Sequence, residues 1–371
     1  MLTDFFSRLL KPKVRLPEMK DTFIRDTTNT SSVRIAVVQF DYQPSALITY
    51  PFIEEPVLLG EGEQGITSLH LSVPGVEVRI ADLRHEVAEG YEDFIRQRVC
   101  RILDHLNSMS VDVVVFPEYS IPASCLAAIN GSAGAYTVVA ASHTVTPATV
   151  VTCRALGIQI EQGDVGKSIC PIRTKDGFWL RVDKLTRSRF EGTLKLGTVW
   201  KPISVQNRDG REWLFAVFLC VDFLNENDEN FQRNVPRDLW SKVHFGVVPS
   251  YSPTLKDFEQ QARSVAERAG RPIAYTNVAI MGGSQVYCHF SEPGALIERH
   301  GTKPLARGDE AVVIVDLPLG HYAQFDHKPT PLPVPPTSQL VSLLPILSSK
   351  RFPQYCALHN KVRTTANDDQ K

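Results

Sequence analysis

Continuous runs of apolar, β-branched residues mark the first strands expected in this chain. Residues 33–40 read VRIAVVQF and residues 111–116 read VDVVVF. A strand without polar alternation is typical of a sheet that is covered on both faces. Between the two runs, from residue 84 to residue 109, apolar residues recur at helical spacing along one face. Strand, helix and strand in this order predict a β-α-β crossover.

The rest of the chain contains more expected strands than helices. Further strands are expected at residues 136–141, 167–173, 179–182, 213–219, 243–248, 273–276, 284–289 and 311–317. Helices are expected at residues 231–242 and 254–269, and the second ends at Gly270, a good helix stop. Because several strands are adjacent, we predict an α/β fold in which two mixed sheets lie between helices, a four-layer α-β-β-α sandwich.

The distribution of proline, glycine and apolar residues divides the chain into three expected segments. We expect an N-terminal extension at residues 1–30, a main domain at 31–325 and a C-terminal arm at 326–371. The main domain carries an insertion rich in Pro and Gly at residues 41–81, and the arm opens with the Pro-rich run KPTPLPVPPTS. A length of 371 residues allows two or three domains at roughly 150 residues each, but one layered domain with tails fits equally well.

The charge balance and the cysteine content indicate which binding partners and which cellular location to expect. The chain has 40 Lys and Arg against 41 Asp and Glu, without long blocks of either sign, so we expect neither nucleic acid nor a membrane surface as a partner. Seven cysteines without a C-x-x-C pair favour reduced thiols, a cytoplasmic location and no structural zinc site. No apolar run approaches 18 residues, so no transmembrane span is expected.

Three chemically useful residues each stand just past an expected strand. They are Glu118 in F-P-E-Y, Lys184 in R-V-D-K-L and Cys220 in L-C-V-D. Taken singly, each has an ordinary interpretation: a solvated turn carboxylate, a surface lysine and a buried inert thiol. Together they could meet at one sheet edge and supply a nucleophile, a base and a cation for an oxyanion, as covalent catalysis requires.

These segments resemble the nitrilase, or carbon-nitrogen hydrolase, superfamily over residues 33–317. The matching motifs are I-A-V-V-Q at residues 35–39, V-V-V-F-P-E ending at Glu118, D-G-F-W-L-R-V-D-K-L containing Lys184, and C-V-D at residues 220–222. The resemblance implies a nitrilase-like fold with Cys220 as nucleophile, Glu118 as general base and Lys184 as the cation that stabilises the oxyanion. It also implies that the backbone N–H of Val221 is a second oxyanion donor.

Other parts of the resemblance add supporting residues. The pair Glu191-Gly192 stands where the amidase branch has a second glutamate, which implies that Glu191 positions substrate and holds the lysine. Residues 262–277 and 282–286 resemble the family's late helix, following strand and G-x-S segment. Tyr119, Phe223 and Ser250 are further candidates for contact with substrate or oxyanion.

The chain also departs from the family, and the departures bear on its substrate. The late helix reads Glu267-Arg268 in place of the usual Glu-Asn, and the common Arg and Pro-Glu after C-x-D are absent. C-x-D resembles amidases, carbamoylases and ureidases more than nitrilases, so amide or carbamoyl substrates are favoured and nitriles are the alternative. A catalytically silent scaffold that binds proteins is another alternative. The absence of a G-x-S-x-G motif and of spaced metal ligands argues against a serine hydrolase or metallophosphoesterase.

We therefore expect a small amide-like substrate, no cofactor and no metal. The resembling family commonly pairs its subunits, so a homodimer or higher homo-oligomer is expected. Residues 1–30 and 326–371 carry apolar side chains with no evident place in a core, and we hypothesise that they mediate self-association or dock a protein partner.

Overall fold

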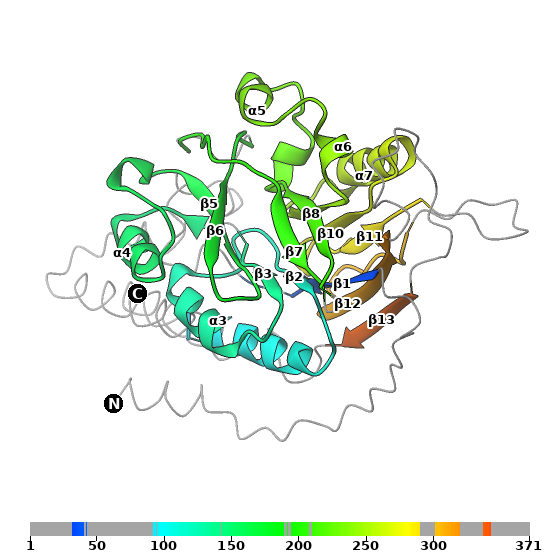
Figure 1. The fold of residues 1–371 in the computed structure, drawn as a ribbon, viewed down its shortest axis with the longest axis horizontal. Coiled ribbons are helices and arrows are strands. Elements are labelled where there is room, and N and C mark those ends of the chain that lie inside the picture. Colours follow the sequence, from blue (N-terminus) through cyan, green and yellow to red (C-terminus); the bar gives the residue numbers. More distant parts are fainter. Residues whose placement is uncertain are drawn as a thin grey trace, which may run out of the picture.

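The computed structural model describes residues 32–40, 42, 92–93, 95–141, 143–188, 191, 194–207, 210–289, 301–319 and 337–342. Figure 1 shows their arrangement. The expected N-terminal extension, the 41–81 insertion apart from Tyr42, and the arm apart from residues 337–342 lie outside the described residues. The helix expected from residue 84 is seen over residues 95–107.

The first sheet of the described chain is mixed and contains eight strands. Their order is β13-β12-β1-β2-β3-β5-β4, and β6 pairs with β5. β1 and β2, like β2 and β3, run parallel, and the other pairs are antiparallel. The strands are β1 Ser32–Gln39, β2 Val113–Val115, β3 Thr137–Val139, β4 His143–Thr144, β5 Ser168–Arg173, β6 Trp179–Asp183, β12 Ala311–Pro318 and β13 Thr337–Ser342. The parallel pairing of β1 with β2 around helical residues 95–107 confirms the expected crossover.

The second sheet is also mixed and follows the order β11-β10-β9-β8-β7. Its strands are β7 Ile203–Gln206, β8 Glu212–Val217, β9 Phe245–Pro249, β10 Ile273–Thr276 and β11 Gln285–Tyr287. The central strands β8, β9 and β10 run parallel, so their carboxyl ends meet at one edge of the sheet. In sheets of this kind, ligands bind outside that edge.

Helices cover the outer faces of the two sheets. They are helical residues 95–107 and the helices α3 Leu126–Ser132, α4 Pro147–Ala155, α5 Glu229–Asn234, α6 Leu239–Lys242 and α7 Leu255–Ala269. Short 3-10 turns occur at Ala123–Cys125, Gln162–Asp164 and Cys220–Phe223. The predicted end of α7 is confirmed, because Gly270 caps it in the left-handed conformation at φ 63°.

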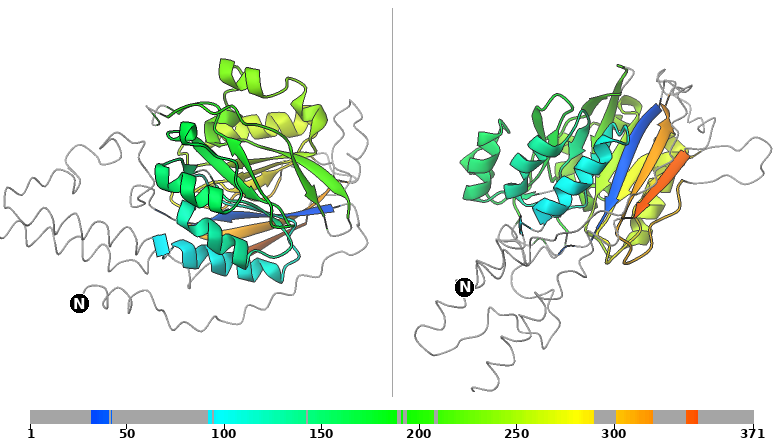
Figure 2. Two further views of the ribbon diagram at one scale, coloured as in Figure 1. Left: turned by 60° about the vertical axis from the view of Figure 1, so that its left-hand side comes forward. Right: turned by 90° about the horizontal axis from the view of Figure 1, so that it is seen from below.

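Three apolar clusters define the layers. One joins β1 residues such as Val38 to Val99 and Leu103 of the outer helix, and a second joins Val37 of β1 to Val247 of β9, between the sheets. A third packs α7, through Phe258, against the outer face of the second sheet. Figures 1 and 2 show residues 95–107 (cyan) and α7 (yellow) on opposite sides of the strands. The predicted four-layer α/β sandwich of two mixed sheets is confirmed.

α3, α4, β4 and β7 were not expected, and two further segments differ from the expectation. The single helix expected at residues 231–242 is wrong: α5 stops at Asn234 and α6 begins at Leu239. Pro236 lies between them, and proline both lacks the N–H that a continuing helix needs and disfavours helical geometry in the residue before it. The second difference is β13, Thr337–Ser342, which pairs with β12 although this segment was expected in an arm outside the core. Its apolar residues are few, so its place at a sheet edge had little pattern to reveal it.

Candidate active site

The candidate catalytic residues come from the ends of strands in both sheets. Glu118 follows β2 through Phe116 and Pro117, Lys184 directly follows β6, and Cys220 stands three residues past the end of β8. The backbone N–H of Glu118 donates to the carbonyl oxygen of Ser250, just past β9, at 3.2 Å. This bond joins the edges of the two sheets where the candidate residues gather.

Lys184 lies at the centre of a buried ionic cluster. Its Nζ donates to Oε1 of Glu118 at 2.7 Å and also to Oε1 of Glu191. The side chains of Lys184 and Glu118 are only 1% and 2% exposed. A buried ammonium is costly unless it is paired and hydrogen-bonded, and here two carboxylates share that task. The cluster is therefore built around the lysine.

The two carboxyl groups of the cluster titrate differently because their surroundings differ. Burial raises the pKa of Glu118 to about 7, the charge of Glu191 adds to this, and Lys184 opposes it only in part. Burial also acts on Glu191, but Lys184 and hydrogen bonds from Tyr119 and the Ser188 N–H hold the pKa of Glu191 below its usual value. Near neutral pH, Glu191 is thus a fixed negative charge, whereas Glu118 can bind or release a proton.

Lys184 itself keeps its charge despite its burial. Desolvation favours the neutral amine, but the neighbouring carboxylates outweigh it and raise the pKa of Lys184 well above the ordinary value. The ammonium is therefore retained throughout the pH range in which Glu118 titrates.

Cys220 occupies a strained turn that presents its sulfur to the cluster. Its φ of 51° lies in the left-handed region, which is uncommon for a residue other than glycine and clusters at functional sites. Sγ accepts a hydrogen bond from Ser250 Oγ at 3.2 Å, and a second from the Tyr251 N–H. Burial and the nearby Glu118 carboxylate raise the pKa of the Cys220 thiol. The thiol is thus protonated at neutral pH and needs a base before it can attack.

Asp222 ties the cysteine turn to the lysine segment. Its carboxylate accepts hydrogen bonds from the N–H groups of Leu185 and Thr186 and from Thr186 Oγ1, at distances between 2.7 and 3.2 Å. The sequence identified this residue only as part of the C-x-D motif. Its bridging role depends on a contact across 36 or 37 residues, which no local pattern reveals.

Tyr119 contacts the ionic cluster with its side chain. Its hydroxyl donates to Oε1 of Glu191, and Lys184 Nζ lies 5.6 Å from the centre of its ring. Tyr119 also has a positive φ, 59°. The sequence proposed it as a contact for substrate or oxyanion, whereas in the structure its hydroxyl is engaged by Glu191.

The remaining candidates are placed as follows. Ser250 contacts the Cys220 sulfur, and Val221 follows Cys220 within the 3-10 turn. Phe223 is buried, with its ring 5.7 Å from that of Phe218, on the side of the turn that packs under the helices. Sequence reasoning missed two tyrosines. The hydroxyl of Tyr42 donates to the backbone carbonyl of Glu118. Burial raises the pKa of Tyr275 well above its ordinary value, and the neighbouring Ser250 hydroxyl offsets only part of this rise.

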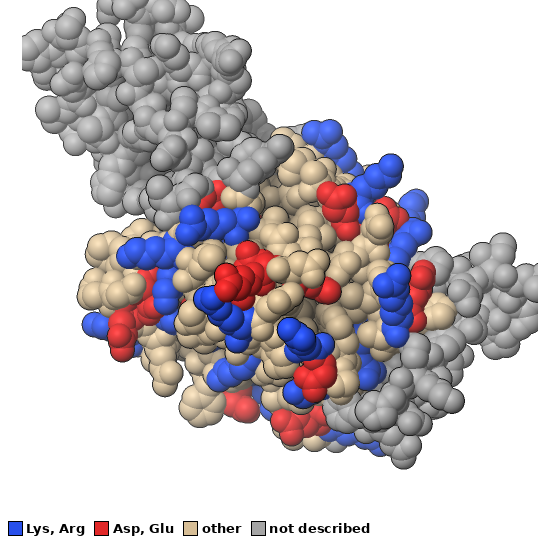
Figure 3. All heavy atoms as spheres, turned by 90° about the horizontal axis from the view of Figure 1, so that it is seen from above, with Lys and Arg blue, Asp and Glu red and all other residues tan. Residues whose placement is uncertain are grey.

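Two absences concern the described part of the chain. Within it, no three His, Cys, Asp or Glu side chains are grouped as metal ligands. None of its helices has the length and apolar character needed to cross a bilayer. Figure 3 shows basic and acidic side chains interspersed over one face of the molecule, as the balanced composition predicts.

Comparison with known proteins gives similarity in structure alone. The sequence matches no protein-family model and no curated protein. Similar solved structures include Saccharomyces cerevisiae Nit3, a member of branch 10 of the nitrilase superfamily, at 13% identity and a TM-score of 0.46, with 77% of this chain and 90% of that chain covered. An amidase from Nesterenkonia sp. is 14% identical with a TM-score of 0.41, covering 81% and 94%. The C. elegans NitFhit protein is 12% identical with a TM-score of 0.42, covering 84% and 61%.

Proposed function

We propose that this chain is a carbon-nitrogen hydrolase of the nitrilase type that cleaves a small amide or carbamoyl substrate through a thioester on Cys220. The observation that carries the proposal is one buried cluster in which a thiol, a carboxyl with a pKa near neutrality and a permanently charged lysine adjoin. Each has a separate task in covalent catalysis. The ordered sequence motifs around these residues support the same reaction.

In the proposed acylation step, the Glu118 carboxylate accepts the thiol proton as Cys220 Sγ attacks the substrate carbonyl carbon. The carbonyl electron pair moves to oxygen, and the Lys184 ammonium and the Val221 N–H stabilise the oxyanion. Collapse of this intermediate breaks the carbon-nitrogen bond. The amine leaves with the proton from Glu118, and a thioester remains on Cys220.

Deacylation uses the same groups in reverse order. Glu118 accepts a proton from water as the water oxygen attacks the thioester carbon, and Lys184 again faces the oxyanion. The carbon-sulfur bond then breaks, the sulfur regains its proton from Glu118 and the acid is released. For a carbamoyl substrate the released acid is a carbamic acid. Glu118 thus acts twice, which suits a pKa close to neutrality.

Glu191 and Asp222 have positioning roles in this proposal. Glu191 holds one proton of the Lys184 ammonium and leaves others for Glu118 and the oxyanion. Asp222 fixes the segment after Lys184 relative to the turn that carries Cys220. Loss of either residue is expected to disturb the distance between the cation and the nucleophile.

The first experiment is a substrate screen with a matched thiol control. Pooled small amides, ureas and nitriles are incubated with wild-type protein, Cys220→Ala and Cys170→Ala, and ammonia and acid products are measured. Cys170 is a second fully buried thiol, in the core between the sheets. We expect Cys220→Ala to lose activity by roughly 10³-fold or more and Cys170→Ala to keep it.

Two results would overturn the proposal. One is undiminished turnover of a found substrate by Cys220→Ala. The other is the failure of every amide, urea and nitrile while folded wild-type protein binds a protein partner, which would favour the silent scaffold. Turnover of nitriles without amides would replace the proposed substrate class and retain the nucleophile.

A further inference from the structure

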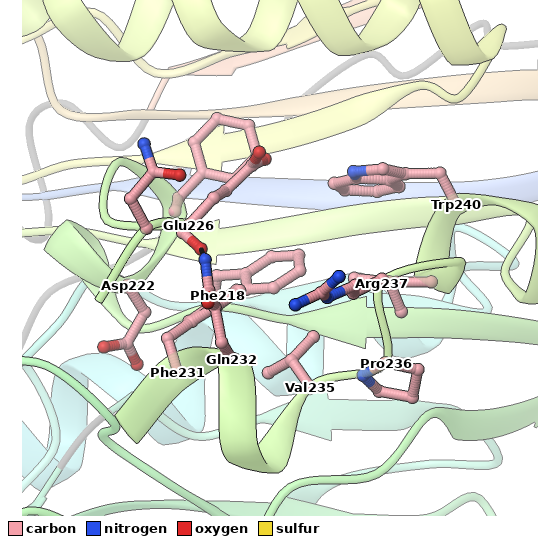
Figure 4. Close-up of a pocket in the computed structure, with 12 residues that line it drawn as sticks. Phe218, Asp222, Glu226, Phe231, Gln232, Val235, Pro236, Arg237 and Trp240 are labelled. Carbon is pink, nitrogen blue, oxygen red and sulfur yellow. Dashed lines mark hydrogen bonds between the residues drawn. The ribbon is translucent and has the colours of Figure 1, made fainter. Parts of the chain in front are cut away.

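A cavity lies beside the turn that carries Cys220. It has a volume of about 200 Å³ and is formed by the end of β8, the Cys220–Phe223 turn, α5, α6 and the segment that joins the two helices. Its lining includes Phe218, Asp222, Glu226, Phe231, Arg237 and Trp240 (Figure 4). Cys220, Glu118 and Lys184 are not among the described residues that line it, so the cavity is distinct from the ionic cluster.

The aromatic part of the cavity lining suits a small apolar group. The centre of the Phe218 ring lies 6.1 Å from the centre of the Phe231 ring and 5.6 Å from the centre of the Trp240 ring. Both phenylalanines are buried and are held by the core beneath α5 and α6. An apolar cavity of roughly 150 Å³ accommodates benzene, so this volume holds one ring with a short substituent. Fixed aromatic walls give such a ligand a preformed surface.

Arg237 supplies the cavity with hydrogen-bond donors that suit an anion. Arg237 makes no salt bridge or hydrogen bond with another residue of the described chain, and Figure 4 shows its guanidinium extending across the middle of the cavity toward Phe218. The two carboxylates of the lining are already engaged. Asp222 accepts from the Leu185–Thr186 backbone, and Glu226 accepts from Gln261 at 2.8 Å. These bonds come from neutral donors and leave both carboxylates charged. Arg237 is the cation of the described lining, and its guanidinium presents a fork of donors that matches a carboxylate.

We propose that this cavity binds a small carboxylate with an aromatic or branched apolar body. The apolar body packs against Phe218 and Trp240, and the carboxylate pairs with Arg237. Because Phe218 and Phe223 lie on either side of Cys220 in the chain, an occupant of the cavity contacts the turn that holds the nucleophile. Binding there restrains the turn and slows its opening to reagents in solution.

The test uses phenylacetate as the probe, with phenylacetamide and benzylamine as uncharged and cationic counterparts. Binding is measured by calorimetry on the full-length Cys220→Ala protein, so that none of the probes is turned over. Two variants are added to this background: Arg237→Gln, and Arg233→Gln as the matched control, since Arg233 is an exposed arginine of α5 that pairs with Glu229 away from the cavity. Both substitutions are at exposed positions, so the fold is retained.

We expect phenylacetate to bind, with phenylacetamide and benzylamine weaker by about tenfold or more, because a charge-assisted pair is lost. Arg237→Gln should weaken phenylacetate binding by a similar factor, and Arg233→Gln should leave it unchanged. In protein with Cys220 intact, saturating phenylacetate should slow the alkylation of Cys220, and this protection should disappear in Arg237→Gln. No binding at millimolar phenylacetate, equal binding of the amide, or full affinity in Arg237→Gln would overturn the proposal.

Discussion

At the scale of the residue, the positions of the main chemical groups could be predicted and their partners could not. Glu118, Lys184 and Cys220 each lie just past the end of a strand, and strands are legible as apolar runs, so their meeting at one edge could be predicted from the fold. The contacts of Tyr119 with Glu191 and of Asp222 with Thr186 join segments 72 and 36 residues apart. Such contacts depend on how loops close over a sheet edge, which no local pattern encodes.

The raised pKa of Glu118 predicts a pH dependence. The base must be ionised to accept the thiol proton, and the pKa of Glu118 is raised by burial to about 7. Below this pH the carboxyl is protonated, so we expect kcat/KM to fall as pH decreases through about 7 and to level off above it. Stopped-assay rates from pH 5 to 9 measure this. Full activity down to pH 5 would mean that Glu118 is not the base.

The hydrogen bond from Ser250 to the cysteine sulfur predicts a change in thiol reactivity. Ser250 Oγ lies 3.2 Å from Cys220 Sγ and lowers the pKa of the Cys220 thiol against the effect of burial. In Ser250→Ala this support is lost and the thiolate becomes rarer, so alkylation at fixed pH should slow by about tenfold. Ser204→Ala, at an exposed serine of β7, is the control. Equal alkylation rates in all three proteins would refute the role of Ser250.

At the scale of the element, strands were easier to predict than short helices and edge strands. The strands β1, β9 and β12 are mostly apolar and almost entirely buried, whereas β7 alternates between buried and exposed positions over only four residues and was missed. The Pro236 interruption between α5 and α6 was visible in the sequence, but the surrounding apolar spacing suggested one helix. That interruption matters, because it forms a wall of the cavity beside the nucleophile turn.

The glycine at the end of α7 gives a stability prediction, and a second glycine serves as a control for which the opposite change in the free energy of unfolding is expected. Gly270 has a φ of 63°, so Gly270→Ala places a side chain in the left-handed region and should lower the free energy of unfolding by about 1 kcal/mol. Gly131 lies inside α3, and a Cβ built there meets no atom within 4 Å. Gly131→Ala should therefore stabilise the protein by about 0.5–1 kcal/mol. Urea unfolding measures both; stabilisation by Gly270→Ala would contradict the capping geometry.

At the scale of the whole molecule, the interface between the two sheets holds the site together. Glu118 follows a strand of one sheet and Cys220 follows a strand of the other, so their distance is set by the apolar layer between the sheets. The two-sheet arrangement was predictable because so many strands lack polar alternation. The expected termini and the long insertion lie largely outside the described residues, and a single chain does not set the oligomeric state, so all three stay predictions.

A substitution of one phenylalanine tests how much the apolar layer between the sheets contributes to stability. Phe215 of β8 is fully buried and stacks on Phe245 at 5.1 Å. Phe215→Ala leaves a cavity between the sheets, and we expect a loss of about 3–5 kcal/mol in the free energy of unfolding. Phe178, which is 72% exposed, provides the control, because Phe178→Ala removes no core contact. A similar, small change in both variants would show that this layer does not carry the stability of the fold.

The central claim is that Cys220 forms a covalent acyl intermediate, and rapid-quench mass spectrometry tests it most directly. Wild-type protein and Cys220→Ala are mixed with an amide found in the screen, quenched in acid within the first turnovers and analysed as intact protein and as peptides. The account predicts an added mass equal to the acyl group on the peptide that contains Cys220, present in the wild type and absent from the variant. Turnover of the amide by Cys220→Ala, or an adduct on another residue of the wild type, would contradict it.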